Sequence, residues 1–127
     1  MIPVPGTVEL GPFSSPGGRL TPWESTADAL RRTQKFWLST VRRDGRPHVT
    51  PLVAFVSLDG VCFVTGSAEQ KSRNLHENNR VVLTTGVDTL TSNDIVLERV
   101  ADLWRITPST AFAHSDGHDF SPTRYVW

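Results

Sequence analysis

The sequence has few of the features that mark secreted, membrane or nucleic-acid-binding proteins. It holds one cysteine, Cys62, so no disulfide can form within the chain, and a reducing cytoplasm is the expected compartment. Thirteen basic and thirteen acidic residues give zero net charge, which argues against non-specific nucleic-acid binding. No apolar run approaches the roughly 20 residues of a membrane-spanning helix. The segment MIPVPGTVELGPFSSPGG lacks the charged and apolar regions of a signal peptide.

Length and composition predict a single domain preceded by a short arm. A chain of 127 residues fits one domain. Residues 1–20 hold many of the prolines and glycines without any periodicity, which predicts an extended N-terminal arm before a domain over residues 21–127. A domain of this size buries only about two-thirds of its unfolded surface, so dimerisation would add stability.

The first regular element that the sequence predicts is a helix over residues 21–34, TPWESTADALRRTQ. Thr21 fits the N-cap position and Pro22 fits the first helical position. Glu24 follows Thr21 by three residues, which is the spacing of a capping box.

From Phe36 onward the hydrophobic pattern changes to that of strands. Asp44-Gly45 and Asp59-Gly60 are tight hairpin signals, and they separate predicted strands over 35–43, 46–58 and 61–66. Pro51 inside the second strand requires an edge position, a bulge or a break.

Four more strands are predicted, over residues 80–87, 94–106, 109–115 and 123–127, with a loop at 89–93. Many short antiparallel strands with few helices favour a mainly β fold, either a small barrel or a sandwich.

The stretch TGSAEQKSRNLHENNR, residues 65–80, follows an apolar strand and predicts a helix. Ser67 fits the N-cap, and Gln70 three residues later completes a Ser-x-x-Gln capping box. Lys71 then lies at the fourth helical position. Because the first turn carries partial positive charge and free N–H groups, a cation there is disfavoured.

No counter-charge for Lys71 is predicted within this helix. Glu69 and Arg73 lie two residues away, a spacing that does not bring helical side chains together, and with Glu77 they form their own i, i+4 stripe. Lys71 is therefore either a solvated surface lysine or part of an anion site. In the second interpretation a phosphate is held by Lys71 and the strand-to-helix turn, Thr65, Gly66 and Ser67.

Three motifs in order give the chain a resemblance to a known family. They are the hairpin segment DGRPHVTPLV, the strand-then-helix segment TGSAEQKSRNL, and the closing segment ITPSTAFAHSDGHDFSPTRYVW. Together they resemble the pyridoxamine 5'-phosphate oxidase-like split β-barrel proteins, which include FMN-binding split barrels. The similarity is closest to the branch that binds the deazaflavin coenzyme F-420, and it covers about residues 27–127.

The resemblance implies a homodimer of split β-barrels with the cofactor, F-420 as first choice or FMN, in a groove at the dimer interface. Similar proteins hold the cofactor phosphate with the Lys-Ser-Arg-Asn helix and the turn before it. Here these residues are Thr65, Gly66, Ser67, Lys71, Ser72 and Asn74. The ring system packs along the second strand, here Thr50, Pro51, Leu52 and Val53. Arg73 matches the motif but lies on the charged stripe, and Glu69 stands where some relatives carry a basic residue.

The activity that the resemblance implies is hydride transfer between the deazaflavin or FMN and a small electron-poor organic substrate. The cofactor would carry the chemistry, so no catalytic side chain is assigned. Relatives usually place a helix and another strand before the closing segment, whereas here the chain passes almost directly from Trp104 to Thr110. The shorter passage favours an alternative, a carrier or sensor without turnover. A further alternative is a haem-binding split barrel with His48 or His114 as axial ligand.

Two smaller clusters have competing interpretations. In the closing TRYVW, Arg124 with an aromatic residue reaches across the dimer to the cofactor, or the aromatic residues fill core or interface space with Arg124 outside. The cluster His114, Asp116, His118 and Asp119 has metal-ligand types, but a polar turn explains it as well. No further Cys or His has a matching spacing, so we predict no metal site.

Overall fold

The computed structural model describes residues 2–57, 60–86, 94–100, 105–114 and 121–127. In chain order the elements are β1 (Thr7–Leu10), α1 (Trp23–Arg32), β2 (Lys35–Val41), β3 (Pro47–Val56), β4 (Val61–Phe63), α2 (Gln70–Glu77), β5 (Arg80–Thr84), β6 (Asp94–Val100), β7 (Arg105–Ile106), β8 (Thr110–His114) and β9 (Thr123–Val126). The mainly β fold predicted from the sequence is confirmed.

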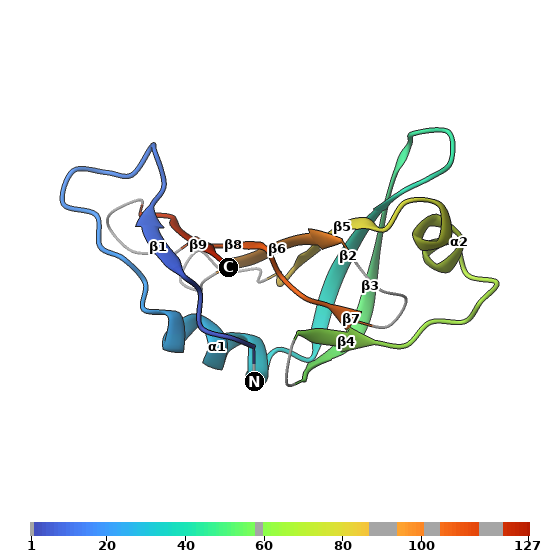
Figure 1. The fold of residues 1–127 in the computed structure, drawn as a ribbon, viewed down its shortest axis with the longest axis horizontal. Coiled ribbons are helices and arrows are strands. Elements are labelled where there is room, and N and C mark those ends of the chain that lie inside the picture. Colours follow the sequence, from blue (N-terminus) through green and yellow to red (C-terminus); the bar gives the residue numbers. More distant parts are fainter. Residues whose placement is uncertain (1, 58–59, 87–93, 101–104, 115–120) are drawn as a thin grey trace.

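The strands pair antiparallel in the order β1-β9-β8-β6-β5-β2-β3-β4-β7 (Figure 1). β6 lies between β5 and β8, whereas β7, which follows it in the chain, lies at the far end beside β4. β6 and β7, which are consecutive in the chain, therefore lie at the two ends of the run from β6 through β5, β2, β3 and β4 to β7. We call this part of the sheet the barrel run. One strand over residues 94–106 was therefore the wrong prediction, because its two halves pair with different neighbours.

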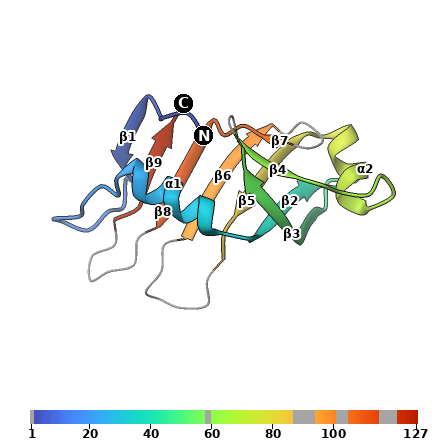
Figure 2. The same ribbon diagram turned by 90° about the horizontal axis from the view of Figure 1, so that it is seen from below.

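Helix α1 covers the part of the sheet that lies outside this barrel run. Its buried residues Trp23, Thr26, Ala27 and Leu30 follow helical spacing. The Trp23 ring packs edge-to-face on Tyr125 and Trp127 of the C-terminal segment, with centroid separations of 5.2 and 5.0 Å. Figure 2 shows α1 crossing the face of β8 and β9. Neither described helix has the length and apolar character needed to span a membrane.

The start of α1 differs from the expected capping box. Pro22 is the N-cap, and no side chain caps the helix. The backbone N–H of Thr21 donates to Thr123 Oγ1 at 2.8 Å, and its carbonyl accepts from the Tyr125 hydroxyl at 2.7 Å. Because β9 holds both backbone groups of Thr21, this residue belongs to the segment before the helix.

The hairpin between β2 and β3 forms as predicted from Asp44-Gly45. Gly45 has φ of 89°, which favours glycine, and the Asp44 carboxylate accepts from the Arg46 N–H at 3.1 Å. Within β3, only Ala54 to Val56 pair with β4. Pro51 therefore has β2 on one side and no paired strand on the other among the described residues, as the edge interpretation requires.

The seam between β4 and β7 depends on close backbone approach at Gly60. A Cβ atom on this residue would lie 2.1 Å from the Ile106 carbonyl oxygen. Only glycine fits where two strands approach this closely.

The arm contains a strand that the sequence did not reveal. β1 pairs with β9 from Thr7 opposite Val126 to Leu10 opposite Thr123. The Glu9 carboxylate and the Arg124 guanidinium form an ion pair across this edge, with an N–O distance of 2.5 Å. The arm is thus attached to the sheet through its own ladder.

Candidate functional site

The strand-to-helix turn is formed by Gly66 to Glu69. The Glu69 N–H donates to the Gly66 carbonyl at 3.1 Å, and Glu69 is the N-cap of α2, with extended backbone and without a side-chain cap. Ser67 as N-cap of a Ser-x-x-Gln box was the wrong prediction, because this backbone turn takes up Ser67 and delays the helix. Lys71 consequently stands at the second helical position.

The positive charge of Lys71 is neutralised by a carboxylate. Its side chain is only 10% exposed, and its Nζ is ion-paired with Oε2 of Glu69. The other oxygen of Glu69, Oε1, accepts from the Gly66 N–H at 3.0 Å. The prediction that Lys71 lacks a nearby counter-charge is wrong, because Glu69 precedes the helix and the spacing rule for helices does not apply to it. The hydrogen bond from Lys71, and next that from the Gly66 N–H, lower the pKa of the Glu69 carboxyl group.

The predicted stripe of charge pairs along α2 does not form. The Arg73 guanidinium donates to the Ala68 carbonyl, with Nη2 at 2.7 Å, and the Glu77 carboxylate lies 3.6 Å from Arg43 Nε. Arg73 thus stabilises the turn before the helix by this hydrogen bond.

The remaining predicted residues of α2 face the sheet. Ser72 and Asn74 are buried. Asn74 Nδ2 donates to Thr40 Oγ1 of β2 at 2.8 Å, and Asn74 Oδ1 accepts from Gln70 Nε2 at 2.7 Å. The bond to Thr40 therefore positions the helix on the sheet, and the bond from Gln70, within α2, orients the Asn74 amide.

The predicted ring-binding residues of β3 point alternately to its two faces. Leu52 is buried, whereas Pro51 and Val53 face outward, with Val53 75% exposed. Other large apolar residues share this outer face of β2 and β3: Trp37, Val49 and Phe55. We call Trp37, Val49, Pro51, Val53 and Phe55 the outer apolar face. A planar ring can stack on this face, whereas Leu52 points to the opposite, buried face of β3.

His48 lies close to the turn and carries an unsatisfied nitrogen. Its Nδ1 is buried and has no hydrogen-bond partner among the described residues. Burial, and then the positive charges of Arg42 and Lys71, lower the pKa of His48. The neutral imidazole is thus favoured beside two cations.

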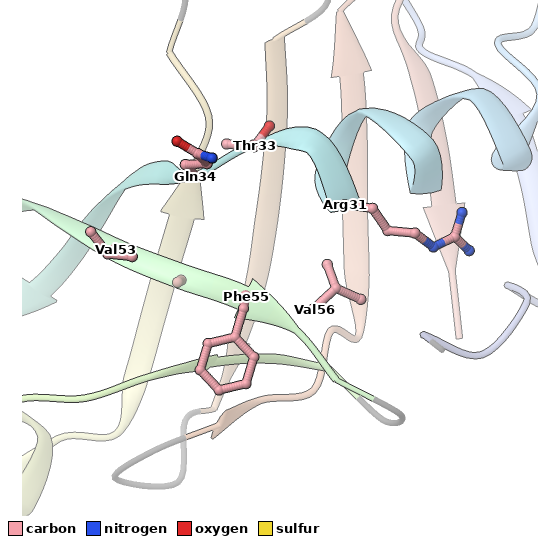
Figure 3. A pocket seen from close by; sticks show the side chains of 7 residues that line it. Arg31, Thr33, Gln34, Val53, Phe55 and Val56 are labelled. Carbon is pink, nitrogen blue, oxygen red and sulfur yellow. The ribbon is translucent and has the colours of Figure 1, made fainter.

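Two hollows lie next to the residues described above, one near the start of α2 and one beside β3. One, of about 390 Å³, is lined at the β2–β3 hairpin and the start of α2 by Arg42, Arg43, Asp44, Arg46 and Gln70. The other, of about 440 Å³, lies between the end of α1 and β3, and its lining residues are labelled in Figure 3 except for Ala54: Arg31, Thr33, Gln34, Val53, Ala54, Phe55 and Val56. The first has a basic lining and the second a largely apolar one.

The C-terminal residues are held within their own chain. Tyr125 is buried, its hydroxyl bonds to Thr26 at 2.9 Å, and burial raises its pKa. The Trp127 indole N–H donates to the Pro3 carbonyl at 2.6 Å. Four strands separate β9, which carries Arg124, from β3. Within one chain, therefore, Arg124 is not brought to the turn.

Within the described ranges, no three His, Cys, Asp or Glu side chains gather as a metal site requires. Asp116, His118 and Asp119 of the suggested cluster lie outside those ranges.

Sequence reasoning selected Gly66 and Lys71 but missed the role of Glu69. The missing information was the start of the helix. The available signal was the position of Glu69, three residues after Gly66. At this spacing a side chain can hydrogen-bond to the backbone of its own turn.

The sequence profile described as pyridoxamine 5'-phosphate oxidase matches residues 23–115. The chain belongs to this family. Its fold is accordingly that of the split β-barrels, as the resemblance implied. No curated protein matches the chain in sequence.

Solved structures agree with this assignment. The conserved hypothetical protein Rv2991 from Mycobacterium tuberculosis is 26% identical, with a TM-score of 0.58 over 65% of this chain and 52% of that one. An F420 reductase is 24% identical, with a TM-score of 0.53 over 59% of this chain and 60% of its own. A heme binding protein from Mycobacterium smegmatis is 15% identical, with a TM-score of 0.61 over 70% of this chain and 52% of its own. This chain thus spans 52% to 60% of these three structures, and the last two show the fold alone.

Proposed function

We propose that the protein is a cytoplasmic, homodimeric oxidoreductase that transfers hydride between a phosphate-bearing deazaflavin, coenzyme F-420, or FMN, and a small electron-poor organic substrate. The observation that carries the proposal is the convergence of the Gly66 N–H and Lys71 Nζ on one anion position. Charge-assisted donors of this kind suit a phosphate. The deazaflavin is the first choice of this proposal, and similarity in fold to an F420 reductase is compatible with it.

The residues present fit such a cofactor. Gly66 and Lys71 would hold its phosphate, with Ser67 on the same turn and Thr65 directly before it. Pro51 and Val53 on the outer apolar face would support its ring, and the hollow beside Val53 offers room for a substrate. The bound cofactor supplies the hydride chemistry, while the chain binds, orients and excludes water. Arg124 would reach the cofactor from the partner subunit.

Replacing Lys71 tests this proposal. The Lys71→Ala variant loses a charge-assisted hydrogen bond, worth about 1.5–3 kcal/mol, so we expect affinity for F-420 and FMN to fall roughly ten- to a hundredfold. Fluorescence titration of the purified protein measures this, with Arg80→Ala, which removes an exposed cation, as the control. Unchanged affinity in Lys71→Ala would refute the phosphate site.

A carrier or sensor without turnover is the second candidate, supported by the direct passage from β7 to β8, which leaves three residues between Ile106 and Thr110. The prereduced cofactor with a panel of reducible substrates separates the two, since a carrier binds but does not oxidise it.

A haem-binding barrel is the third candidate, and the unsatisfied Nδ1 of His48 favours it, as does similarity in fold to a heme binding protein. Haem titration of wild type and His48→Ala decides this case. Haem affinity that depends on His48 and not on Lys71 would replace the flavin-type proposal.

A further inference from the structure

The anion position at the turn is filled by a side chain of the protein itself. One carboxylate accepts from both Lys71 Nζ and the Gly66 N–H, the latter at 3.0 Å. Carboxylate and phosphate oxygens accept from the same donors with similar geometry. Glu69 therefore stands where the oxygens of an anionic ligand would lie.

The two sides of this contact differ in their freedom to move. The Lys71 side chain is 10% exposed, whereas that of Glu69 is 52% exposed. The turn itself does not need the carboxylate, because the Glu69 N–H bonds to the Gly66 carbonyl and Arg73 bonds to the Ala68 carbonyl. Glu69 can thus rotate into solvent while the donors stay in place.

We propose that Glu69 is a built-in competitor for the anion position, and that its carboxylate must leave Gly66 and Lys71 before a phosphate group can bind. The identity of the phosphate ligand rests on the proposed function, but the competition itself does not. After displacement the carboxylate remains near the ligand, and its charge disfavours ligands that carry further anionic groups close to the phosphate.

The experiment uses Glu69→Gln, which keeps the size of the side chain and removes its charge. The matched control is Glu77→Gln, since Glu77 lies on the same helix with a 50% exposed side chain but pairs with Arg43. Inorganic phosphate is titrated into each protein while the Gly66 amide is followed by NMR. We expect the apparent Kd for phosphate to fall about tenfold in Glu69→Gln and to stay unchanged in Glu77→Gln. Glu69→Ala should reproduce the gain.

A second titration compares FMN with riboflavin, which has the same ring and no phosphate. Glu69→Gln should bind FMN about tenfold more tightly than wild type does, with riboflavin affinity unchanged. Equal phosphate affinity in wild type and Glu69→Gln, no phosphate response of Gly66, or an equal gain for riboflavin would each overturn the competitor.

The two proposals fail separately. If Glu69→Gln strengthens phosphate binding while no variant binds F-420 or FMN, the competitor stands and the cofactor proposal falls. If wild type binds FMN through Lys71 and Glu69→Gln adds nothing, the cofactor proposal stands and the competitor falls.

Discussion

At the residue scale, Lys71 is tolerated in the first turn of α2 because two features act together. Glu69 neutralises its charge, and burial against the sheet holds it in place. The sequence led to the right question about this lysine, because helix-dipole physics marks a cation in a first turn as unusual. The partner of Lys71, Glu69, was not predicted, because the pairing depends on whether Glu69 lies inside the helix or before it.

His48 gives a pH-dependent prediction at the same scale. Its pKa is lowered in the folded protein by burial and by Arg42 and Lys71, whereas an unfolded histidine titrates near 6.5. As pH falls below about 6.5, the unfolded chain binds a proton that the folded protein binds less readily, so stability decreases until the lowered pKa is passed.

We expect His48→Gln to reduce this decrease by about a few tenths of a kcal/mol. Urea unfolding of both proteins at pH 7.5 and pH 5.5 measures the difference. Equal decreases in wild type and variant would contradict the assignment to His48.

At the element scale, Gly60 controls whether β4 can pair with β7. In Gly60→Ala the new Cβ meets the backbone oxygen of Ile106 at 2.1 Å, so a strand must move, and we expect a loss of about 2 kcal/mol or more. Gly6→Ala is the control, because its Cβ would lie at an ordinary 3.7 Å from the Val126 carbonyl. Thermal and denaturant unfolding compare them, and equal stabilities would show that the seam tolerates a side chain.

Most strands could be predicted because they alternate buried and exposed residues. β2 and β5 show this pattern, and Asp44-Gly45 marks the turn between β2 and β3. β1 could not, because all four of its residues are exposed and no buried face marks it as a strand; it is defined by its pairing with β9. The break between β6 and β7 was hidden because residues 94–106 contain no Gly or Pro to mark a turn, and periodicity does not show which strands pair.

Helix starts were missed for a related reason. Thr21 and Ser67 have the residue types of N-caps, but distant β9 holds the backbone of Thr21 and the turn 66–69 displaces Ser67. The candidate site was therefore predictable as a phosphate-binding turn with a lysine, and unpredictable in its detailed contacts.

At the scale of the whole molecule, the outer apolar face is a candidate surface for binding a partner. Trp37, Val53 and Phe55 on neighbouring strands are 39%, 75% and 58% exposed, and a contiguous exposed apolar patch is typical of an interaction site. We expect a homodimer that buries it.

Val53→Asp should shift the dimer toward monomer by at least about tenfold in Kd, because it places a charge in an apolar contact. Phe13→Asp is the control, since Phe13 is 85% exposed on the arm. Sedimentation velocity over a concentration series measures both. A dimer unaffected by Val53→Asp would move the interface elsewhere.

The pairing of β1 with β9 also sets an order of events during synthesis. Thr7 pairs with Val126, so β1 leaves the ribosome well before β9, the strand with which it pairs. At the usual rates of translation the gap between them is roughly 10 seconds. During that interval the backbone groups of β1 and the apolar side chains of Val8 and Leu10 are available to any other open strand edge. Chaperones that bind short extended segments therefore have a defined window on this chain, which closes when β9 emerges.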